Sequence, residues 1–467
     1  MTFSSPLDSF GASMASGPRN TRVLPVDVPK IGRVLFSGPS KSFLEDWTFE
    51  LSRSSPDAAH LREAASQLQK SETPVAFPTE TVYGLGADAT RSSAVQGIYA
   101  AKQRPSDNPL IVHISSLSQL RRLLLSPSHG PPGADQADYD PIPSIYHPLI
   151  SRFWPGPLTI LLPLPNPSPL APEVTASLPT FAVRMPSSLL ALALIHLADV
   201  PLAAPSANAS TKPSPTTAAH VLNDLAGRID LILDGGPCDV GVESTVVDGF
   251  SNPPVILRPG GVSIGMLRQC PGWERVMVGY KDGAEKGVPR APGMKYKHYS
   301  PRARVILVEG GLDVALMEEY EADGCIGVLT TNKWHMSKFR QRVLTNGGNE
   351  STTANGTSSP PNGTRFDGQS KAAVDASLVA STTSDSCAKL LHVKRGDSSN
   401  NGHLDVWAIS LGSDTASIAR GLFSALRELD QKNVDTILVE SISDNEGDAA
   451  AAVMNRLRKA AEVQIKR

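Results

Sequence analysis

The chain has 467 residues, 40% of them hydrophobic, which is enough apolar material for more than one folded domain. The 44 Lys and Arg residues nearly balance the 46 Asp and Glu residues, and the formal net charge of −2 excludes a strongly basic coat protein for nucleic acid. No apolar run approaches the ~20 residues that a membrane-spanning helix requires, so we expect no membrane partner.

Residues 1–54 show no regular hydrophobic period, and we predict a flexible N-terminal extension there. The stretch is rich in serine and carries Arg19, Arg22 and Arg33, so an additional mitochondrial form is an alternative to a purely cytoplasmic protein. The four cysteines include no Cys-x-x-Cys pair, which argues against a zinc site or a disulfide framework. Cysteines that stay reduced are typical of a cytoplasmic protein.

A regular α/β pattern begins at Ser55, which is placed to cap a helix whose first residue is Pro56. Helices are predicted from there to about residue 70 and at about 92–101, 187–198 and 215–226. Short apolar runs predict strands at 75–78, 110–114, 158–162, 181–184, 200–204, 231–234, 245–248 and 255–258. Residues 55–268 are therefore expected to form an α/β domain on one open sheet, interrupted by a surface loop at 126–143.

Residues 269–302 show little periodicity and are predicted to be a linker. A smaller α/β domain is expected over 303–467, with strands at 305–308, 325–329, 406–410 and 436–439 and helices at 416–431 and up to about 461. Residues 345–401 are dominated by Ser, Thr, Asn and Gly, and such a segment buries too little apolar surface to offset the entropy lost on ordering. We predict a disordered insert there.

Several common catalytic signatures are absent from the sequence. It contains no Gly-Lys dipeptide, and therefore no Walker A loop, and no G-x-G-x-x-G motif opens a helix. Residues 261–265 match the G-x-S-x-G nucleophile elbow of serine hydrolases. Because Ser263 does not turn directly off a strand, capping of a short helix is the favoured interpretation and a hydrolase is the alternative.

Positively charged side chains stand at or near the ends of several predicted elements. Lys102 and Arg104 are two residues apart just beyond a helix, while Arg184 and Arg258 each end an apolar strand. Ligands of open α/β sheets collect beyond strand ends, so these loops are expected to converge. Four cations among hydroxyls and glycines predict a site for a polyphosphate and a small carboxylate. These residues indicate a nucleotide-using enzyme without a Walker loop.

The segments around these cations resemble the threonylcarbamoyl-AMP synthase family, in one consistent order. The resemblance rests on FPTETVYGLG at 77–86, KQRP at 102–105, NPLIVH at 108–113, WPGPLT at 154–159, VRMP at 183–186, PSAN at 205–208, ESTVVD at 243–248 and LRPG at 257–260. Residues 290–301 resemble the linker of the long, two-domain form, and residues 454–461 resemble the end of its second domain. The implied fold is a YrdC-like open twisted sheet with helices, followed by a smaller Rossmann-like α/β domain.

This resemblance implies an enzyme that condenses L-threonine, bicarbonate and ATP to threonylcarbamoyl-AMP and pyrophosphate. The product feeds the threonylcarbamoyladenosine modification of tRNA through the tRNA threonylcarbamoyl transferase machinery. Mg²⁺ is implied as the companion of ATP, and no protein ligands for a metal are identified. The alternative function is a double-stranded RNA or tRNA-binding module, although the near-zero net charge and the 5% aromatic content argue against tight RNA binding.

The resemblance also implies two sets of binding residues. The ATP set is Lys102, Arg104, Asn108, Thr180, Ala204, Ser206, Asn208, Ser214, Arg258 and, from the linker, Tyr299. The threonine set is Thr81, His113, Arg184 and Ser244, with Arg184 pairing with the substrate carboxylate. Without the resemblance, His113 is more typical of a buried core histidine. The basic end of the linker, around Tyr299, is predicted to close over ATP as a lid.

Overall fold

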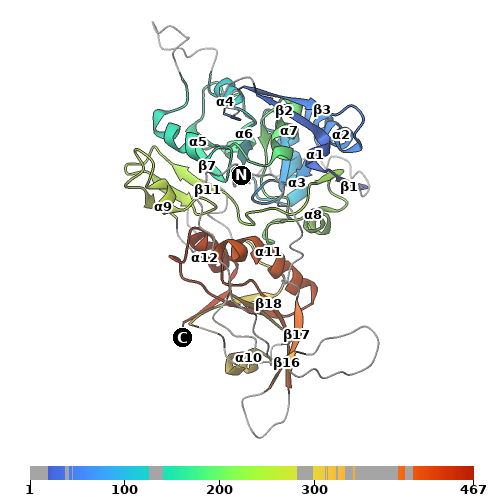
Figure 1. Cartoon of the computed structure of the whole chain (residues 1–467), viewed down its shortest axis with the longest axis vertical. Helices are drawn as coiled ribbons and strands as arrows, with labels where there is room; N and C mark the ends of the chain where they lie inside the picture. Colours follow the sequence, from blue (N-terminus) through green and yellow to red (C-terminus); the bar gives the residue numbers. More distant parts are fainter. Residues whose placement is uncertain are drawn as a thin grey trace, which may run out of the picture.

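The chain folds into two α/β bodies that lie end to end (Figure 1). The computed structural model describes residues 19–36, 42–44, 46–125, 140–280, 298–310, 312, 314–321, 324–331, 340–341, 388–394 and 403–466. The first body, drawn blue to yellow, ends at residue 280, and the second, drawn from ochre to red, holds the strands and helices from residue 304 onward. The α/β class predicted from the sequence is confirmed for both bodies.

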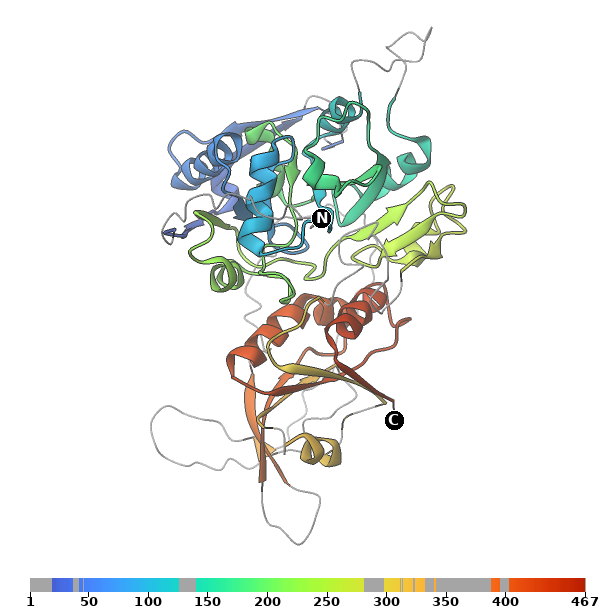
Figure 2. The same cartoon turned by 180° about the vertical axis from the view of Figure 1, so that it is seen from behind.

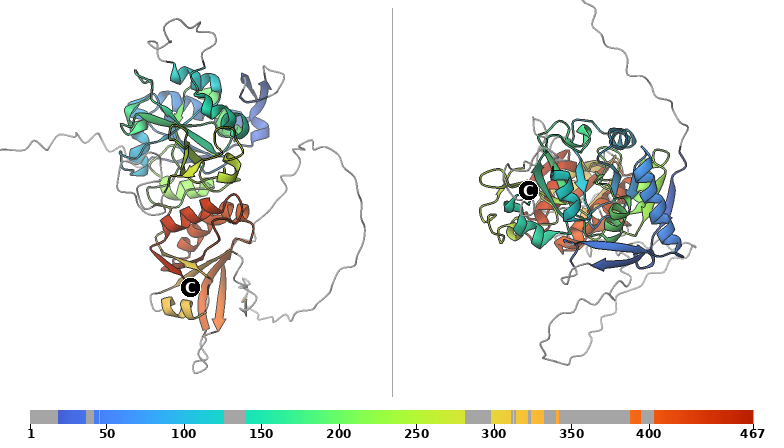
Figure 3. Two further views of the ribbon diagram at one scale, coloured as in Figure 1. Left: turned by 90° about the vertical axis from the view of Figure 1, so that its left-hand side faces the viewer. Right: turned by 90° about the horizontal axis from the view of Figure 1, so that it is seen from above.

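The first body is built on one open, mixed sheet of 11 described strands. From one edge to the other these are β1 (Arg22–Pro25), β10 (Leu231–Asp234), β4 (Val75–Phe77), β5 (Gly84–Asp88), β9 (Leu202–Ala203), β6 (Ile111–His113), β8 (Thr180–Arg184), β7 (Leu158–Pro163), β11 (Thr245–Asp248), β12 (Val255–Arg258) and β13 (Met277–Val278). A hairpin of β2 (Gly32–Phe36) and β3 (Trp47–Leu51), drawn dark blue, lies at the edge of the first body in the view from above (Figure 3).

Helices surround this sheet. They are α1 (Val28–Ile31), α2 (Pro56–Lys70), α3 (Ser92–Lys102), α4 (Leu117–Leu124), α5 (His147–Phe153), α6 (Pro172–Thr175), α7 (Leu189–Ala198), α8 (Ala218–Leu225) and α9 (Ile264–Leu267), with a 3₁₀ turn at Ser144–Tyr146. Ser55 caps α2 by accepting a hydrogen bond from the amide of Ala58 at 3.4 Å, as predicted. No helix in the described ranges has the length and apolarity to cross a bilayer.

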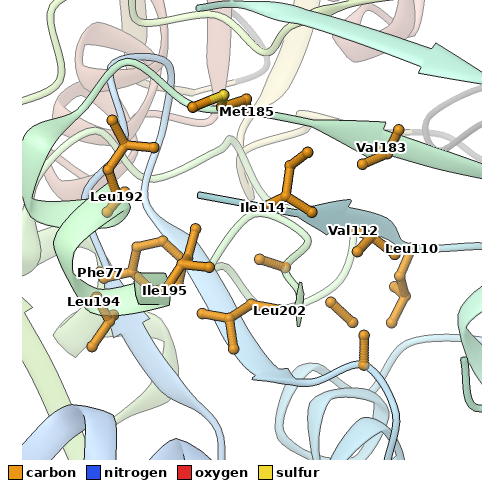
Figure 4. Close-up of a cluster of buried hydrophobic side chains, with 14 of the residues drawn as sticks. Phe77, Leu110, Val112, Ile114, Val183, Met185, Leu192, Leu194, Ile195 and Leu202 are labelled. Atoms are coloured by element: carbon orange, nitrogen blue, oxygen red, sulfur yellow. The ribbon is translucent and has the colours of Figure 1, made fainter. Parts of the chain in front are cut away.

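The core of the first body lies between α7 and the strands that carry polar residues at their ends. Figure 4 shows Leu192 and Ile195 of α7 packed beside Phe77, Val112 and Val183 of the sheet. All five side chains are almost fully buried. Burial of aliphatic and aromatic side chains contributes ~1.5–3 kcal/mol each, so this core holds the strand ends firmly in place.

The prediction of a flexible extension over residues 1–54 is wrong for the part that the structure describes. Strand β1 pairs in parallel with β10, whose partner residues lie some 200 positions later in the chain. Trp47 on β3 is buried, stacks on His196 with ring centroids 4.6 Å apart and donates a hydrogen bond from Nε1 to the carbonyl of Ser115 at 3.0 Å. These strands are stabilised by long-range packing, which the local hydrophobic period does not reveal.

Replacing Trp47 with alanine is therefore expected to lower the free energy of unfolding by about 3–5 kcal/mol. Leu35, on the neighbouring strand β2, is 43% exposed and provides the matched control, because its replacement by alanine is expected to cost less than about 0.5 kcal/mol. Chemical denaturation of both variants measures the difference. Similar stabilities for the two variants would contradict the packing role of Trp47.

The second body is a parallel-rich sheet between two layers of helices. Its described strands run in the order β16 (Arg340–Gln341), β17 (Lys389–Lys394), β18 (His403–Ser410), β15 (Ile326–Thr330), β19 (Thr436–Glu440), β14 (Arg304–Glu309) and β20 (Val463–Lys466). Alternate residues of β14 pack on opposite sides, Val305 and Leu307 toward α11 (Thr415–Gln431) and α12 (Ala450–Ala460), and Ile306 and Val308 toward α10 (Val314–Glu321). The view from behind shows α11 and α12 on the side that faces the first body (Figure 2).

Two further boundaries differ from the predictions. Within the predicted disordered insert 345–401, residues 389–394 form β17, which pairs antiparallel with β18, and the rest of the insert apart from Ala388 lies outside the described residues. Within the predicted linker 269–302, Cys270, Trp273 and Val276 are buried in the core of the first body. That body therefore extends to about residue 280. Residues 281–297 of the predicted linker and lid lie outside the described residues.

Candidate active site

A pocket opens where loops from several strand ends of the first body meet the second body. It encloses about 980 Å³ of empty space, the open solvent at its mouth included. The sequence-based expectation that the polar strand ends converge is confirmed. The predicted residues that line the pocket are Thr81, Lys102, Arg104, Asn108, His113, Arg184, Ala204, Ser206, Asn208, Ser214, Ser244, Arg258 and Tyr299.

Thr180 is the one predicted binding residue that does not line this pocket. It begins β8 and pairs in register with Pro163, while Arg184 at the other end of the same strand lines the pocket. Four residues of extended chain span about 13 Å, so the two ends of β8 lie in different surroundings. Because β6 and β8 are parallel, with Ile111 opposite Ala182, Thr180 lies at the same end of the sheet as Asn108, and its contact with ATP stays a prediction.

Arg184 is buried at one end of the pocket with hydrogen-bonding capacity to spare. Its Nη1 donates to Thr81 Oγ1 at 2.9 Å, and its Nη2 lies 2.6 Å from Glu80 Oε1 in a buried ion pair. In the described part of the chain, Nε and Nη2 make no hydrogen bond of normal geometry. A buried guanidinium with unused donors is suited to gripping a carboxylate.

His113 is the register partner of Arg184 on the parallel strand β6. Its Nδ1 lies 3.3 Å from the carbonyl oxygen of Ile111, which only accepts hydrogen bonds, so Nδ1 carries the proton and Nε2 is left as an acceptor. Burial, reinforced by the positive charges of Arg184 and Arg258, lowers the pKa of His113 to about 3. The imidazole is therefore neutral at physiological pH.

This low pKa predicts a measurable pH dependence of stability. The unfolded chain protonates an imidazole near pH 6.5, whereas folded His113 stays neutral down to about pH 3, so stability is lost as the pH falls from 6.5 toward 3. His113→Asn removes this contribution, which is on the order of 2 kcal/mol at pH 4.5. Urea unfolding at pH 7 and pH 4.5 should show a smaller difference for the variant than for the wild type. Identical pH dependence in the two proteins would contradict the assignment.

The other end of the pocket is lined by Lys102 and Arg104. Lys102 is buried and Arg104 is half-buried, and Lys102 Nζ donates to the carbonyls of Ser206 and Asn208, the latter at 2.6 Å. Arg104 Nη2 donates to the carbonyl of Pro109 at 3.2 Å, while in the described residues its Nε and the nearby Asn108 Oδ1 have no hydrogen-bond partner. Burial lowers the pKa of Arg104 to about 10, which leaves it charged at neutral pH. Unpartnered buried polar atoms are costly unless a ligand satisfies them.

Ser244 and Arg258 connect the two ends of the pocket. Arg258 Nε donates to the backbone oxygen of Ser244 and Nη2 to its hydroxyl, both at 3.1 Å. The hydroxyls of Ser244 and Thr159 are also within hydrogen-bonding distance, at 2.8 Å. A Cβ added to Gly260 would lie 2.2 Å from the backbone of Ser244, so only glycine allows the two loops to approach this closely.

Tyr299, at the end of the linker, forms a wall of the pocket and packs on the second body. Its ring stacks on Phe423 of α11 with centroids 5.2 Å apart, and the guanidinium carbon of Arg456 lies 5.7 Å from its ring centroid. Val82 and Val242 of the first body belong to the same buried cluster. The pocket therefore depends on both bodies.

Sequence reasoning did not identify the carboxylates that pair with the arginines in and around the pocket. Glu80 pairs with Arg184, Glu243 with Arg456 at 3.0 Å, and Asp224 with Arg427 through both of its oxygens at 2.8 and 3.2 Å. Glu80 and Glu243 lie inside the TETVYG and ESTVVD segments, where a carboxylate beside predicted binding residues was the available signal. No local pattern connects Asp224 or Glu243 to arginines about 200 residues away.

Two further observations concern a serine nucleophile and a bound metal ion. Ser263 Oγ accepts a hydrogen bond from the amide of Met266 at 3.2 Å at the start of α9, which confirms the capping interpretation. Ser263 does not line the pocket, so the hydrolase alternative is not supported. In the ranges that the structure describes, no group of three or more His, Cys, Asp and Glu side chains is arranged to hold a metal ion.

Known proteins resemble the chain along most of its length. The family model Sua5_yciO_yrdC, described as telomere recombination, matches residues 67–260, and the C-terminal domain of threonylcarbamoyl-AMP synthase matches residues 262–462. The threonylcarbamoyl-AMP synthase of Schizosaccharomyces pombe is 45% identical over 86% of this chain and 88% of that protein, and the one from Bacillus subtilis is 39% identical over 90% and 98%. The crystal structure of Pyrococcus abyssi Sua5 complexed with L-threonine is 33% identical, with a TM-score of 0.66 and coverage of 96% of this chain and 100% of that one.

Proposed function

The chain belongs to the threonylcarbamoyl-AMP synthase family, and we propose that it condenses L-threonine, bicarbonate and ATP in the pocket between its two bodies. The observation that carries this proposal is one pocket with a buried guanidinium for a carboxylate at one end and a cluster of cations at the other. The relatives named as synthases span both bodies, so a module that only binds RNA is not favoured.

Threonine is proposed to bind at Arg184. Two of the three nitrogens of this guanidinium have unused hydrogen-bonding capacity, which suits a bidentate grip on the α-carboxylate. Neutral His113, with its Nε2 lone pair, is an acceptor for the threonine hydroxyl. A site built to accept a hydrogen bond from that hydroxyl would disfavour valine, because the buried acceptor would then be left unpartnered.

The triphosphate is proposed to bind at Lys102, Arg104 and Arg258. The pocket lining carries five cationic side chains, Lys102, Arg104, Arg184, Lys212 and Arg258, against one carboxylate, Glu243. Glu80 and Asp224 next to the lining pair with Arg184 and Lys212, so the remaining excess of positive charge lies at the Lys102 end. An excess of buried positive charge favours a polyanion in this part of the pocket.

In the proposed reaction bicarbonate takes up a proton and loses water to give CO₂, and the threonine nitrogen adds to that CO₂ and loses a proton, giving a carbamate. A carbamate oxygen attacks the α-phosphorus of ATP, the bond from that phosphorus to the bridging oxygen breaks, and pyrophosphate leaves. The chain would act by holding the two reactants in line and by neutralising charge, without a covalent intermediate. Mg²⁺ would enter with ATP, since the described residues form no carboxylate cage of their own. We further propose that the product passes to the tRNA threonylcarbamoyl transferase machinery.

Pyrophosphate release from ATP by the full chain tests this function. The rate should depend on threonine and bicarbonate together, and a mass of threonylcarbamoyl-AMP should appear in step with pyrophosphate. Serine, glycine and valine in place of threonine serve as controls for the amino-acid site. Pyrophosphate release that ignores threonine and bicarbonate would contradict the proposal.

A further inference from the structure

Arg456 lies on α12 of the second body, yet its side chain is buried against the loops of the first body that line the pocket. Its Nε donates to Glu243 Oε2 at 3.0 Å, and its Nη1 donates to the backbone oxygen of Pro259. Glu243 belongs to the loop before β11, and Pro259 follows β12. A single side chain of the second body therefore joins two loops of the first.

These two loops carry residues that are proposed to contact both substrates. Ser244 directly follows Glu243, and Arg258 directly precedes Pro259. The loops already touch, because Arg258 donates to the backbone of Ser244 and Gly260 lies against the same backbone. A displacement of either loop would therefore move both Ser244 and Arg258.

Glu243 also fixes the direction of a hydroxyl in the pocket. Ser214 donates its hydroxyl proton to Glu243 Oε1 at 2.5 Å, so toward a ligand the Ser214 oxygen offers only lone pairs. Burial alone raises the pKa of Glu243, but the charges of Arg456 and Arg258 and the Ser214 hydrogen bond outweigh it and lower the pKa. Without a cation beside it, a carboxyl buried to this extent would be protonated more readily and would lose its hold on the Ser214 proton.

We propose that Arg456 is a positioning residue for the nucleotide end of the site, which it organises from the second body through Glu243 and the backbone of Pro259. This inference rests on the proposed function, because Arg258 is a proposed contact of the triphosphate, and Ser214 and Ser244 are predicted binding residues that line the same pocket. It gives the second body a specific task in the reaction, namely to set the polarity of Ser214 and the separation of two loops. Arg456 itself contacts neither the carbamate nor the α-phosphate.

The test compares Arg456→Gln with Arg420→Gln in the full chain. Arg420 is a matched control, since its Nε also joins the two bodies, at 2.9 Å from the backbone oxygen of Asp239, but its side chain is exposed and does not line the pocket. Arg456→Gln is expected to raise the KM for ATP at least about tenfold, as for the loss of a charge-assisted contact, with a smaller change in the KM for threonine. Arg420→Gln is expected to leave both KM values within about twofold. Arg456→Lys, which keeps the charge beside Glu243, should recover part of the loss.

A second measurement separates positioning from simple docking of the two bodies. If Arg456 acts through Glu243, the double variant Arg456→Gln/Glu243→Gln should have about the same affinity for ATP in titration calorimetry as the single variant with the lower ATP affinity. Strictly additive losses, or equal losses of turnover and thermal stability in the Arg456 and Arg420 variants, would overturn the proposal. Wild-type turnover in the same assay reports on the proposed function by itself. Its absence contradicts that function, whereas an active wild type with an unchanged Arg456→Gln variant overturns only the role of Arg456.

Discussion

Replacing Arg184 with lysine is expected to raise the KM for threonine about tenfold to a hundredfold while leaving the KM for ATP within about twofold. Lysine keeps a positive charge beside Glu80, so the buried carboxylate retains a partner and the fold is expected to survive. It does not reproduce the planar fork that grips a carboxylate through two nitrogens. The loss therefore falls on the substrate that carries the carboxylate.

Steady-state pyrophosphate release at varied threonine and varied ATP measures the two constants. Arg91→Lys is the matched control, because Arg91 also pairs with a buried carboxylate, that of Asp88 at 3.1 Å, but lies outside the pocket lining. Both KM values of that variant should match the wild type. An equal rise of both KM values in Arg184→Lys would mean that Arg184 supports the pocket as a whole and that threonine binds elsewhere.

Local sequence patterns predicted the elements whose stability is largely local. Helices α2, α3, α7 and α11 appear within a few residues of the predicted ranges, because their apolar period and caps are written in consecutive residues. Strand β5 was missed because Gly84-Leu-Gly-Ala-Asp88 lacks the β-branched residues typical of strands. The reason for its glycine is tertiary, since a Cβ on Gly86 would lie 2.6 Å from the ring of Phe77. Such a contact between strands has no local signature.

The site residues also divide into those inside short sequence motifs and those that only the tertiary structure brings together. Side chains inside short motifs, such as Lys102 and Ser206, could be predicted by resemblance, and the pocket brings them together. Thr180, Ala204 and Ser214 stand outside the matching segments, and of these three only Thr180 is absent from the pocket lining. In the sequence, the only predicted binding residue beyond the first body was the linker residue Tyr299. The pairing of Glu243 with Arg456 was not predicted, because the two residues are 213 positions apart in the chain. Predicting that pair requires knowing how the two bodies dock.

The docking of the two bodies also changes what the linker is expected to do. Residue Ser300 donates from its backbone amide to the carbonyl of Thr211 at 2.9 Å and from its hydroxyl to the carbonyl of Ala460 at 3.4 Å. Tyr299, next to it, is buried between the bodies and lines the pocket. This end of the linker is thus a fixed wall of the site, tied to both bodies.

Tyr299→Ala is accordingly expected to reduce turnover about a hundredfold and to lower the free energy of unfolding by about 3–5 kcal/mol. The substitution removes the ring that packs on Phe423 and opens the pocket wall, which admits water to the carbamate and to the mixed anhydride. Turnover is measured at a temperature where circular dichroism shows the variant to be folded. Denaturation of the variant without substrates measures the change in the free energy of unfolding separately.

Tyr299→Phe distinguishes the wall from the hydroxyl. Phenylalanine preserves the volume and the stacking on Phe423, so stability should change by less than about 1.5 kcal/mol. Burial, with the nearby charge of Glu243, raises the pKa of Tyr299, so its phenol is neutral at physiological pH and contributes at most a neutral hydrogen bond worth about 0.5–1.5 kcal/mol. We therefore expect Tyr299→Phe to keep turnover within about tenfold of the wild type. If it were as inactive as Tyr299→Ala, the hydroxyl and not the ring would be the essential group. If Tyr299→Ala retained full turnover, this end of the linker would form no essential wall of the site.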